Sequence, residues 1–271
     1  MSKTILTPEQ EQEIVCKYKA GSSKNALHLE YKVSEGTIKR ALKRNNVFVR
    51  QIQDTNISRY YINQDFFDKE KITQNSAYIL GLLAADGWVS NTENCIGLEL
   101  KTEDIQILQD INVILENERE IKTYSRQERN DTSKIYFFSQ KMKKDLAYFN
   151  IVPNKTYMNM DFAKKIPDDF FFDFVRGLFD GDGSVTASNG TVRWQIDGTS
   201  LATFQHIQSC FSRLGIQLKI RIEPDKKSTI TKYRLYCYSK ERCKKIFNLL
   251  YNNSILKLER KYQKFLALLD E

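Results

Sequence analysis

The strongest constraint on the fold of this chain is a short segment that occurs twice. GLLAADGWV occupies residues 81–89, and GLFDGDGSV occupies residues 177–185. In both copies an apolar run ends in an Asp-Gly pair, and Asp182 follows Asp86 by 96 positions. Repetition at such a spacing indicates two similar units that bury faces against each other.

The sequence around the two copies repeats the same order of expected elements. Each copy closes a helical pattern, SAYILGLLAAD and then FFFDFVRGLFDGD, and strands with alternating apolar residues follow. One further helical pattern separates the strands, and another closes each copy. The order αββαββα therefore occurs twice, and we expect two halves packed about a pseudo-twofold axis. The prediction is an α+β fold whose halves occupy residues 75–165 and 166–271.

Positive charge is concentrated near the N-terminus. The first 50 residues hold 10 Lys+Arg against 5 Asp+Glu, whereas the remaining residues hold 32 against 29. Three short helical patterns fill this part, and a very short turn at 32–34 joins the second to the third. This layout predicts an all-α helix-turn-helix DNA-binding domain at residues 1–48, with a protein-binding three-helix module as the alternative. The side chains expected on the DNA-reading helix are Thr37, Lys39, Arg40, Lys43 and Arg44.

The segment 49–74 is predicted to be a linker. It is rich in Asn, Gln and Asp, with one short packed element expected at Phe66-Phe67. The chain has five cysteines without a CxxC pair and only two histidines, so its sequence offers few ligands for a zinc site. The odd number of cysteines favours reduced thiols in a cytoplasmic protein. The apolar run before Asp86 has nine residues and MSKTILTPEQ is no signal peptide, so we expect no membrane partner.

The strands of both halves alternate apolar side chains with basic, amide and aromatic ones. Such alternation is typical of an antiparallel sheet with one covered face and one open face. Arg, Lys, Gln and Tyr suit contacts with phosphates and with base edges in a major groove, although an ordinary solvent-facing surface is the alternative for any one strand. The residues predicted to bind DNA here are Lys122, Tyr124, Arg126, Arg193, Gln195, Lys219, Arg221, Lys232, Arg234 and Tyr236.

Small residues mark one stripe of each first helix and predict close packing of the two helices. The residues of this predicted helix interface are Gly81, Ala85, Gly177 and Gly181. If the helices lie side by side, their C-terminal ends meet and bring Asp86 and Asp182 together. A carboxylate near a helix C-terminus opposes the macrodipole by about 0.3–1 kcal/mol, and two adjacent carboxylates repel each other.

A divalent cation would remove both penalties at Asp86 and Asp182. Oxygen ligands favour a hard ion, so Mg²⁺ is the natural choice, and Mn²⁺ is an acceptable substitute. A metal ion beside a phosphodiester can activate water and stabilise the leaving oxygen. We therefore predict two catalytic metal ligands. The alternative for a single motif is an Asp-Gly helix stop followed by a turn.

GLLAADG and GLFDGDG resemble the two signature motifs of the LAGLIDADG homing endonucleases in their single-chain form. The lead-in INQDFFDKEKITQNSAYILGLLAADG and the closing segments FNIVPNKTY and ILKLERKYQKF are also similar to those of the family. The resemblance covers residues 60–271 and implies a saddle of two sheets, Mg²⁺-dependent double-strand cleavage of a long DNA site, and short 3′ overhangs. It implies that Asp86 and Asp182 bind metal and that Lys155 and Lys261 assist the chemistry, with Lys257 a rival of Lys261.

The first motif departs from the family pattern at one position. Ala84 stands where the motif has its first acid, whereas the second copy keeps Asp180. We expect this difference to make the two halves inequivalent without abolishing cutting. The N-terminal helix-turn-helix lies outside the core of the family and is expected to lengthen the recognised site.

The function predicted from the sequence is a site-specific homing endonuclease, an enzyme of intron homing or another mobile element. Its catalytic residues are expected to be Asp86, Asp182, Lys155 and Lys261, and its partner double-stranded DNA. A monomer is expected because one chain supplies both halves. We expect it in the cytoplasm of a bacterium, encoded by the bacterium or by a phage, or else in an organelle. A non-cleaving transcription regulator and an RNA-splicing maturase on the same fold are the alternatives. A pure DNA binder has no use for two carboxylates facing DNA, which argues against the regulator.

Overall fold

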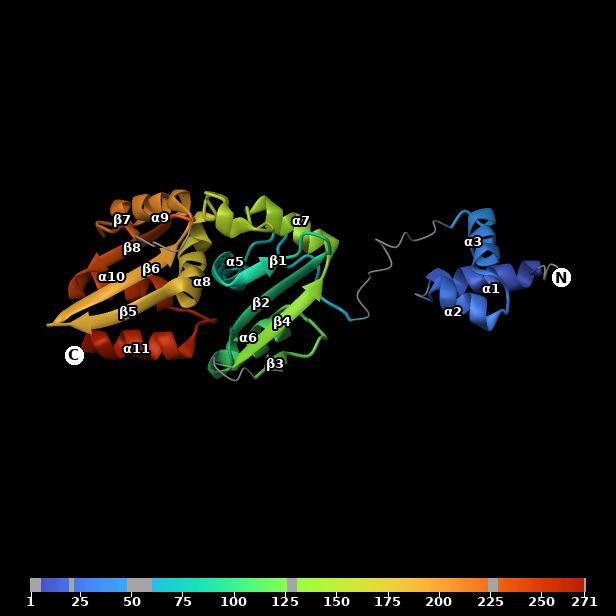
Figure 1. Ribbon diagram of the computed structural model, residues 1–271, viewed down its shortest axis with the longest axis horizontal. Helices are drawn as coiled ribbons and strands as arrows, with labels where there is room; N and C mark the ends of the chain where they lie inside the picture. The colour runs from blue at the N-terminus through green and yellow to red at the C-terminus, as the bar shows by residue number, and fades with distance from the viewer. Residues whose placement is uncertain (1–5, 20–21, 48–59, 126–130, 224–228, 271) are drawn as a thin grey trace. The chain divides into compact units, whose positions relative to one another are not determined.

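The computed structural model describes residues 6–19, 22–47, 60–125, 131–223 and 229–270 (Figure 1). The chain divides into two compact units, Met1–Arg59 and Tyr60–Glu271. Among the described residues, no helix has the length and apolarity needed to cross a membrane. All five cysteines are free thiols.

The N-terminal unit consists of three short helices around a small apolar core. Ser23 and Ser34 cap the second and third helices, because each side chain accepts a hydrogen bond from a backbone N–H of the first turn. Ile14, Leu27 and Ile38, one from each helix, are fully buried at the centre. The three helices expected from the sequence are present as α1 (Pro8–Lys19), α2 (Lys24–Glu30) and α3 (Glu35–Arg44).

The C-terminal unit contains the predicted duplication, and the α+β fold with two αββαββα halves is confirmed. Each half places a helix before a four-stranded antiparallel sheet, a second helix between the second and third strands, and a third helix after the last strand (Figure 1). The strand orders are β1-β2-β4-β3 and β5-β6-β8-β7. The first half comprises α5 (Gln74–Ala85), β1 (Gly87–Val89), β2 (Cys95–Lys101), α6 (Ile105–Ile114), β3 (Lys122–Tyr124), β4 (Thr132–Phe138) and α7 (Gln140–Tyr148). The second comprises α8 (Phe171–Asp182), β5 (Gly183–Ser188), β6 (Thr191–Gly198), α9 (Leu201–Arg213), β7 (Lys219–Glu223), β8 (Lys232–Tyr238) and α10 (Lys240–Tyr251), followed by α11 (Glu259–Asp270).

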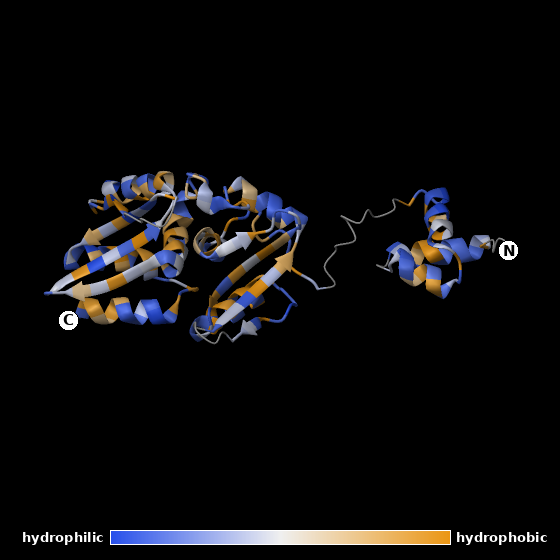
Figure 2. Cartoon of the chain, in the orientation of Figure 1, coloured by the Kyte–Doolittle hydropathy of each residue, from blue (hydrophilic) through white to orange (hydrophobic). Residues whose placement is uncertain are grey.

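Each sheet buries one face in the core, as the alternation along the strands predicts. In the second sheet, Trp194 pairs with Cys237 and Ile196 pairs with Leu235 across β6 and β8, and all four side chains are buried. Figure 2 shows the resulting alternation of hydrophobic and hydrophilic residues. Ile222 is an exception. The alternation in QLKIRIE predicts that its side chain shares the apolar face with Leu218 and Ile220, but it is 66% exposed. It lies on β7, an edge strand of this sheet, where less of the core covers the strand.

The second part of the segment predicted as a linker, 49–74, packs into the C-terminal unit, and the buried Phe67 belongs to the short packed element expected there. The compact C-terminal unit starts at Tyr60, and Ile62, Phe67 and Ile72 are buried in its core. The backbone N–H of Asn63 donates to the carbonyl of Leu115 at 3.0 Å, which ties this segment to the end of α6. Residues 48–59, the rest of the predicted linker, lie outside the described residues.

Candidate active site

Helices α5 and α8 lie side by side with their backbones in close contact. A Cβ atom on Gly81 would lie 2.1 Å from the carbonyl oxygen of Phe174, and one on Gly177 would lie 2.0 Å from that of Tyr78. Any side chain at either glycine would therefore force the helices apart. The structure thus places the stripe of small residues expected at the helix interface between the two halves, where they face each other.

The two helices end at the two acids. Asp86 is the C-cap residue of α5, and Asp182 is the last residue of α8. The next pair of small residues brings these ends together: a Cβ atom on Gly181 would lie 2.3 Å from the Cβ of Ala85 and 3.0 Å from Oδ2 of Asp86. The structure therefore brings the two acids to one place, as the sequence pattern led us to expect.

The environment of the two carboxylates disfavours their negative charges. Both keep a solvent-exposed surface, but protein surrounds them elsewhere. Loss of hydration raises the pKa of Asp86, against the positive charges of Lys261 and Lys155. The pKa of Asp182 is raised to about 7, first by loss of hydration and then by the negative charge of Asp86. Two acids held in this way are suited to binding a cation.

Two lysines bind the backbone beside the acids. Lys155 Nζ donates to the carbonyl of Gly87, and Lys261 Nζ donates to the carbonyls of Phe179, Gly181 and Gly183 at 2.9, 2.8 and 2.6 Å. Each ammonium group thereby satisfies carbonyls at a helix C-terminus, where positive charge is favourable.

The two lysines occupy equivalent places in the two halves. Lys155 binds the carbonyl of Gly87 and Lys261 binds that of Gly183, and these glycines directly follow Asp86 and Asp182. Burial lowers the pKa of both lysines, that of Lys261 to about 8.

The structure shows which of the two candidate lysines, Lys257 or Lys261, lies beside the acids. The ammonium group of Lys257 lies 3.8 Å from a carboxylate oxygen of Glu259 and 4.7 Å from the ring centre of Tyr262. Lys261, in the first turn of α11, reaches the end of α8. The counterpart of Lys155 is therefore Lys261.

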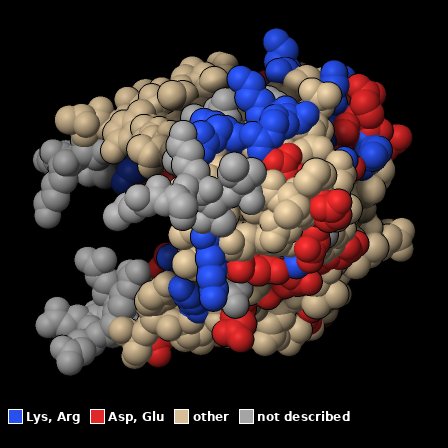
Figure 3. All heavy atoms as spheres, turned by 90° about the vertical axis from the view of Figure 1, so that its right-hand side faces the viewer, with Lys and Arg blue, Asp and Glu red and all other residues tan. Residues whose placement is uncertain are grey.

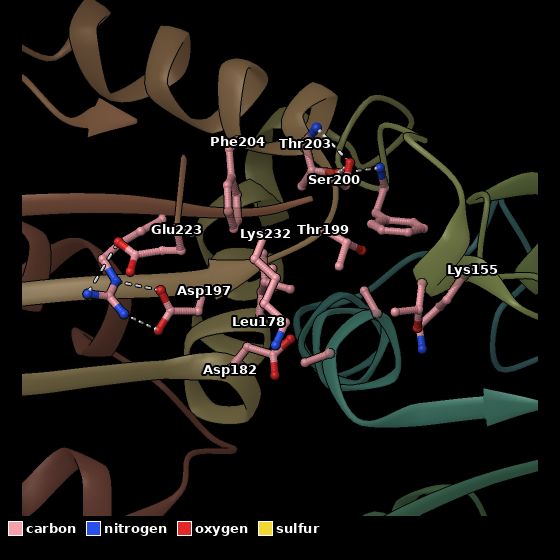
Figure 4. A pocket seen from close by; sticks show the side chains of 16 residues that line it. Lys155, Leu178, Asp182, Asp197, Thr199, Ser200, Thr203, Phe204, Glu223 and Lys232 are labelled. Atoms are coloured by element: carbon pink, nitrogen blue, oxygen red, sulfur yellow. Dashed lines mark hydrogen bonds and ion pairs between the residues drawn. The ribbon is translucent and has the colours of Figure 1, made fainter. Parts of the chain in front are cut away.

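Two cavities flank the helix ends, and each combines an acid of one half with the lysine of the other. The first, of about 560 Å³, is lined by Asp182 and Lys155, with Ala84 and side chains of the second sheet (Figure 4). The second, of about 360 Å³, is lined by Asp86 and Lys261, with Asp180 and side chains of the first sheet. The pseudo-twofold arrangement thus produces two composite centres, each dependent on both halves. We call them the Asp182/Lys155 centre and the Asp86/Lys261 centre.

Asp180 is fully enclosed and accepts three hydrogen bonds. Its Oδ2 accepts from the hydroxyl of Tyr78 and from the backbone N–H of Leu258, and its Oδ1 accepts from the hydroxyl of Tyr251, each at 2.8 Å. Burial raises the pKa of Asp180, while these three donors oppose the rise. The equivalent residue of the first half, Ala84, has no side chain able to accept such bonds.

Arg176 is a second buried anchor, which the sequence reasoning missed. Its Nε donates to the carbonyl of Leu256 at 2.9 Å, its Nη1 donates to the carbonyl of Leu250 at 2.7 Å, and Asp173 forms an ion pair with it at 2.7 Å. The equivalent residue of the first half is Leu80. The signal in the sequence was this charged residue at an otherwise apolar position of the repeat.

The residues predicted to bind DNA on the second sheet lie on its open face, and several are engaged with neighbours. Arg234 contacts Asp197 at 2.5 and 3.0 Å and also pairs with Glu223, which binds Arg221 at 2.5 Å. The sequence alone did not predict the pairing of these arginines with Asp197 and Glu223, because it depends on the register between neighbouring strands. The remaining predicted residues on these strands, Arg193, Gln195, Lys219, Lys232 and Tyr236, are exposed or partly exposed.

The open face of the first sheet is more aromatic than expected. Lys134 lies over the rings of Trp88, Tyr124 and Tyr136 at 6.0, 5.0 and 5.8 Å, and Lys122 lies over Tyr136 at 5.1 Å. Of the residues predicted here, Lys122 and Tyr124 belong to this surface, whereas Arg126 lies outside the described residues. The sequence reasoning missed Trp88, Lys134 and Tyr136, although the alternation in SKIYFFS placed the last two opposite the core.

In the N-terminal unit, α3 presents basic side chains to solvent. Lys39, Arg40 and Lys43 are exposed, whereas Arg44 forms an ion pair with Glu11 of α1. Thr37 is hydrogen-bonded to the cap residue Ser34 and lies 3.4 Å from Arg40 Nη2. In the view of Figure 3, Lys and Arg side chains gather in several groups, some of which lie beside Asp and Glu.

Two segments of the chain, residues 73–157 and 169–250, match the model of a family described as LAGLIDADG-like domain. Among solved structures, the meganuclease I-SmaMI bound to uncleavable DNA is 13% identical with a TM-score of 0.48, covering 72% of this chain and 88% of that one. I-DmoI in complex with DNA and Ca is 18% identical with a TM-score of 0.46, covering 73% and 98%. I-LtrWI bound to target DNA is 12% identical with a TM-score of 0.45, covering 77% and 91%. No sequence among curated proteins matches the chain.

Proposed function

The chain belongs to the LAGLIDADG-like domain family, and from this premise we propose that it is a site-specific endonuclease that cuts both strands of duplex DNA with a divalent metal ion. One observation carries the proposal: Asp86 and Asp182 converge at the ends of two packed helices, each in a cavity that also holds a lysine of the other half. One chain supplies both centres, so we propose that it acts as a monomer.

The two acids fit a hard divalent cation. Each stands at a helix C-terminus with a raised pKa, so a positive ion there relieves unfavourable charge. Carboxylate oxygens favour Mg²⁺, with Mn²⁺ as a substitute. Among the described residues no group of three or more His, Cys, Asp or Glu could hold a metal. Asp86 and Asp182 would therefore be the protein ligands, and water and DNA phosphate oxygens would complete the coordination. When bound, such an ion polarises the phosphodiester and makes water more acidic.

The protein's own side chains would stabilise the charge that develops at the phosphate. In hydrolysis the oxygen of water bonds to phosphorus, one P–O ester bond breaks, and the leaving oxygen takes up a proton. Lys155 and Lys261 are buried ammonium groups held in place by helix carbonyls. A fixed positive charge in a partly dehydrated cavity stabilises the additional negative charge on the phosphate oxygens without reorganising.

The open faces of the two sheets would hold the DNA on either side of the acids. Basic groups supported by aromatic rings on the first sheet suit phosphate and base contacts. On the second sheet, Arg234 can donate to base edges and its partner Asp197 can accept from them. The substrate class is therefore a duplex long enough to cross both sheets.

We propose that the N-terminal unit binds DNA next to this site and lengthens the recognised sequence. The exposed basic residues of α3 carry this part of the proposal. Replacing Lys39, Arg40 and Lys43 together by alanine in the full chain should weaken binding and shorten the footprint. The slope of log affinity against log salt should fall by about one for each DNA phosphate that the variant no longer neutralises. An unchanged footprint and slope would assign the unit to another partner.

The test of the endonuclease is selection of cleaved molecules from a random duplex library in Mg²⁺, with Asp86→Asn and Asp182→Asn as matched variants. We expect discrete cut sites with short 3′ overhangs, and a drop in cutting of about a hundredfold or more in both variants, since each loses a metal ligand. Binding of the selected site should remain in both variants.

Enrichment by binding without cleavage would instead support a regulator. Preferential competition by RNA over duplex DNA would support a maturase. Equal cutting by either Asp→Asn variant would remove that acid from the mechanism.

A further inference from the structure

We propose that Asp180 is a positioning residue that holds Lys261 in the Asp86/Lys261 centre, and that the two strands of the DNA are cut by unequally supported centres because Ala84 gives no such hold on Lys155. This inference rests on the proposed endonuclease function and deepens it.

Asp180 acts on Lys261 through the start of α11. Its Oδ2 accepts the backbone N–H of Leu258 at 2.8 Å, and the carbonyl of Leu258 in turn accepts the backbone N–H of Lys261 at 3.0 Å. The carboxylate therefore fixes the residue from which the first turn of α11 is built. The ammonium group of Lys261 then reaches the three carbonyls at the end of α8.

Two arginines fix the same segment from other sides. Arg176 holds the carbonyls of Leu250 and Leu256, just before α11. Arg260, adjacent to Lys261, contacts Asp104 of the first half at 3.2 and 2.8 Å, and Asp104 is only 8% exposed. Lys261 thus stands on a segment tied both to α8 and to the opposite half.

The counterpart segment is attached differently. Lys155 stands at the start of a short 3₁₀ turn, Lys155–Tyr157, after Asn154, whose φ of 58° lies in the left-handed region. Where α8 has Arg176 and Asp180, α5 has Leu80 and Ala84, which offer no hydrogen bond from their side chains. The cavity next to Ala84 is also the larger one, about 560 Å³ against about 360 Å³.

The consequence is specific to one strand, because each cavity is lined by only one of the two motif-end acids, Asp86 or Asp182, and by the lysine of the opposite half. Removing the Asp180 carboxylate releases Leu258 and loosens Lys261, which serves the centre with Asp86. The centre formed by Asp182 and Lys155 keeps both of its groups. We therefore expect Asp180→Ala to cut one strand faster than the other, so that nicked DNA accumulates before the double-strand break forms.

The experiment measures both strand cuts separately on the selected duplex, each strand carrying its own label, under single-turnover conditions with saturating Mg²⁺. Asp180→Ala should slow one strand about 10–100-fold, the range found when a supporting partner of an active-site group is removed. The other strand should stay within about threefold of the unmodified protein. Lys261→Met should slow the same strand as Asp180→Ala, and Lys155→Met should slow the opposite one.

Two matched variants separate positioning from general damage. Asp180→Asn keeps an amide oxygen for the N–H of Leu258, so it should recover most of the missing rate. Tyr251→Phe removes the donor to the other carboxylate oxygen and leaves the contact with Leu258, so it should leave the ratio of the two strand-cutting rates as in the unmodified protein. Thermal midpoints and duplex affinity of every variant establish that it is folded.

Equal slowing of both strands by Asp180→Ala, or by Lys261→Met, would overturn the inference while leaving the endonuclease intact. If Asp180→Ala fails to fold, the opposite strand preferences of the two Lys→Met variants decide the matter, together with recovery in Asp180→Asn. Absence of cutting by the unmodified protein on any duplex would reject the proposed function itself.

Discussion

Helices α5 and α8 follow the same path in the two halves but are attached to their surroundings in different ways. Both place a glycine at the contact, an acid at the end, and a lysine from a later segment on the carbonyl after that acid. The second helix adds Arg176 and Asp180, which are buried and bind backbone or hydroxyl groups. The first has Leu80 and Ala84 in their place.

This difference separates what the duplicated fold requires from what each half adds. Close helix contact and a cation at each helix end are needed on both sides of the pseudo-twofold axis. Arg176 and Asp180 add polar contacts from α8 to the closing segment of the second half. In the second half that segment runs from Tyr251 through Leu258 into α11.

The largest expected effect comes from removing the buried arginine. Arg176→Met should lower the free energy of unfolding by about 3–5 kcal/mol, because Asp173 is left buried without its partner and two carbonyls lose a donor. The equivalent change in the first half, Leu80→Met, should cost less than about 1.5 kcal/mol. Urea unfolding followed by tryptophan fluorescence measures this, since Trp88 and Trp194 both lie in the C-terminal unit. Equal losses would mean that the two helices are anchored alike.

The next effect should be the same in both halves. Gly81→Ala and Gly177→Ala each place a Cβ atom about 2 Å from a backbone oxygen of the other helix. Overpacking of this kind costs about 1–3 kcal/mol, or more where backbone must move. The same urea experiment should give similar losses for the two variants. A loss confined to one variant would contradict the symmetric helix contact.

The smallest effect concerns pH in the absence of metal. The pKa of Asp182 is raised to about 7 from an ordinary value of 3.8, so the folded chain holds this proton more tightly than the unfolded chain. The resulting stabilisation is complete below about pH 4 and is lost as the pH rises through about 7. Between about pH 5 and pH 7, Asp182→Asn should therefore lose less stability than the unmodified chain in metal-free buffer. A steeper loss of stability with rising pH in the variant would mean that the pKa of Asp182 is not raised in the folded chain.

Local patterns in the sequence predicted the parts of the fold that depend on local spacing. Alternation along VRWQIDG placed Trp194 and Ile196 in the core, and small residues at four-residue spacing indicated the contact of α5 with α8. Ile222 follows the same alternation yet is exposed, because an edge strand is covered less than a central one. Periodicity gives the face of a strand, and tertiary packing decides how far that face is covered.

The site was predictable to the extent that it is repeated. Asp86 and Asp182 end two copies of one motif, so each supports the assignment of the other. Lys155 and Lys261 were predicted from the resemblance of the closing segments to the family, and the contacts of Lys261 with the end of α8 distinguish it from Lys257. The interactions that hold Lys261 occur once and join segments about 80 residues apart, as between Asp180 and Leu258. No local pattern reports such a pairing, and it became visible only with the fold.

The most direct test of the account is whether Asp86 and Asp182 together hold a divalent cation on DNA. Mn²⁺ is titrated into the protein bound to its selected duplex, and free Mn²⁺ is measured by electron paramagnetic resonance. The account predicts tight binding that is weakened about tenfold or more by Asp86→Asn and by Asp182→Asn, and abolished when both are changed. Unchanged Mn²⁺ binding in the doubly substituted protein would contradict it.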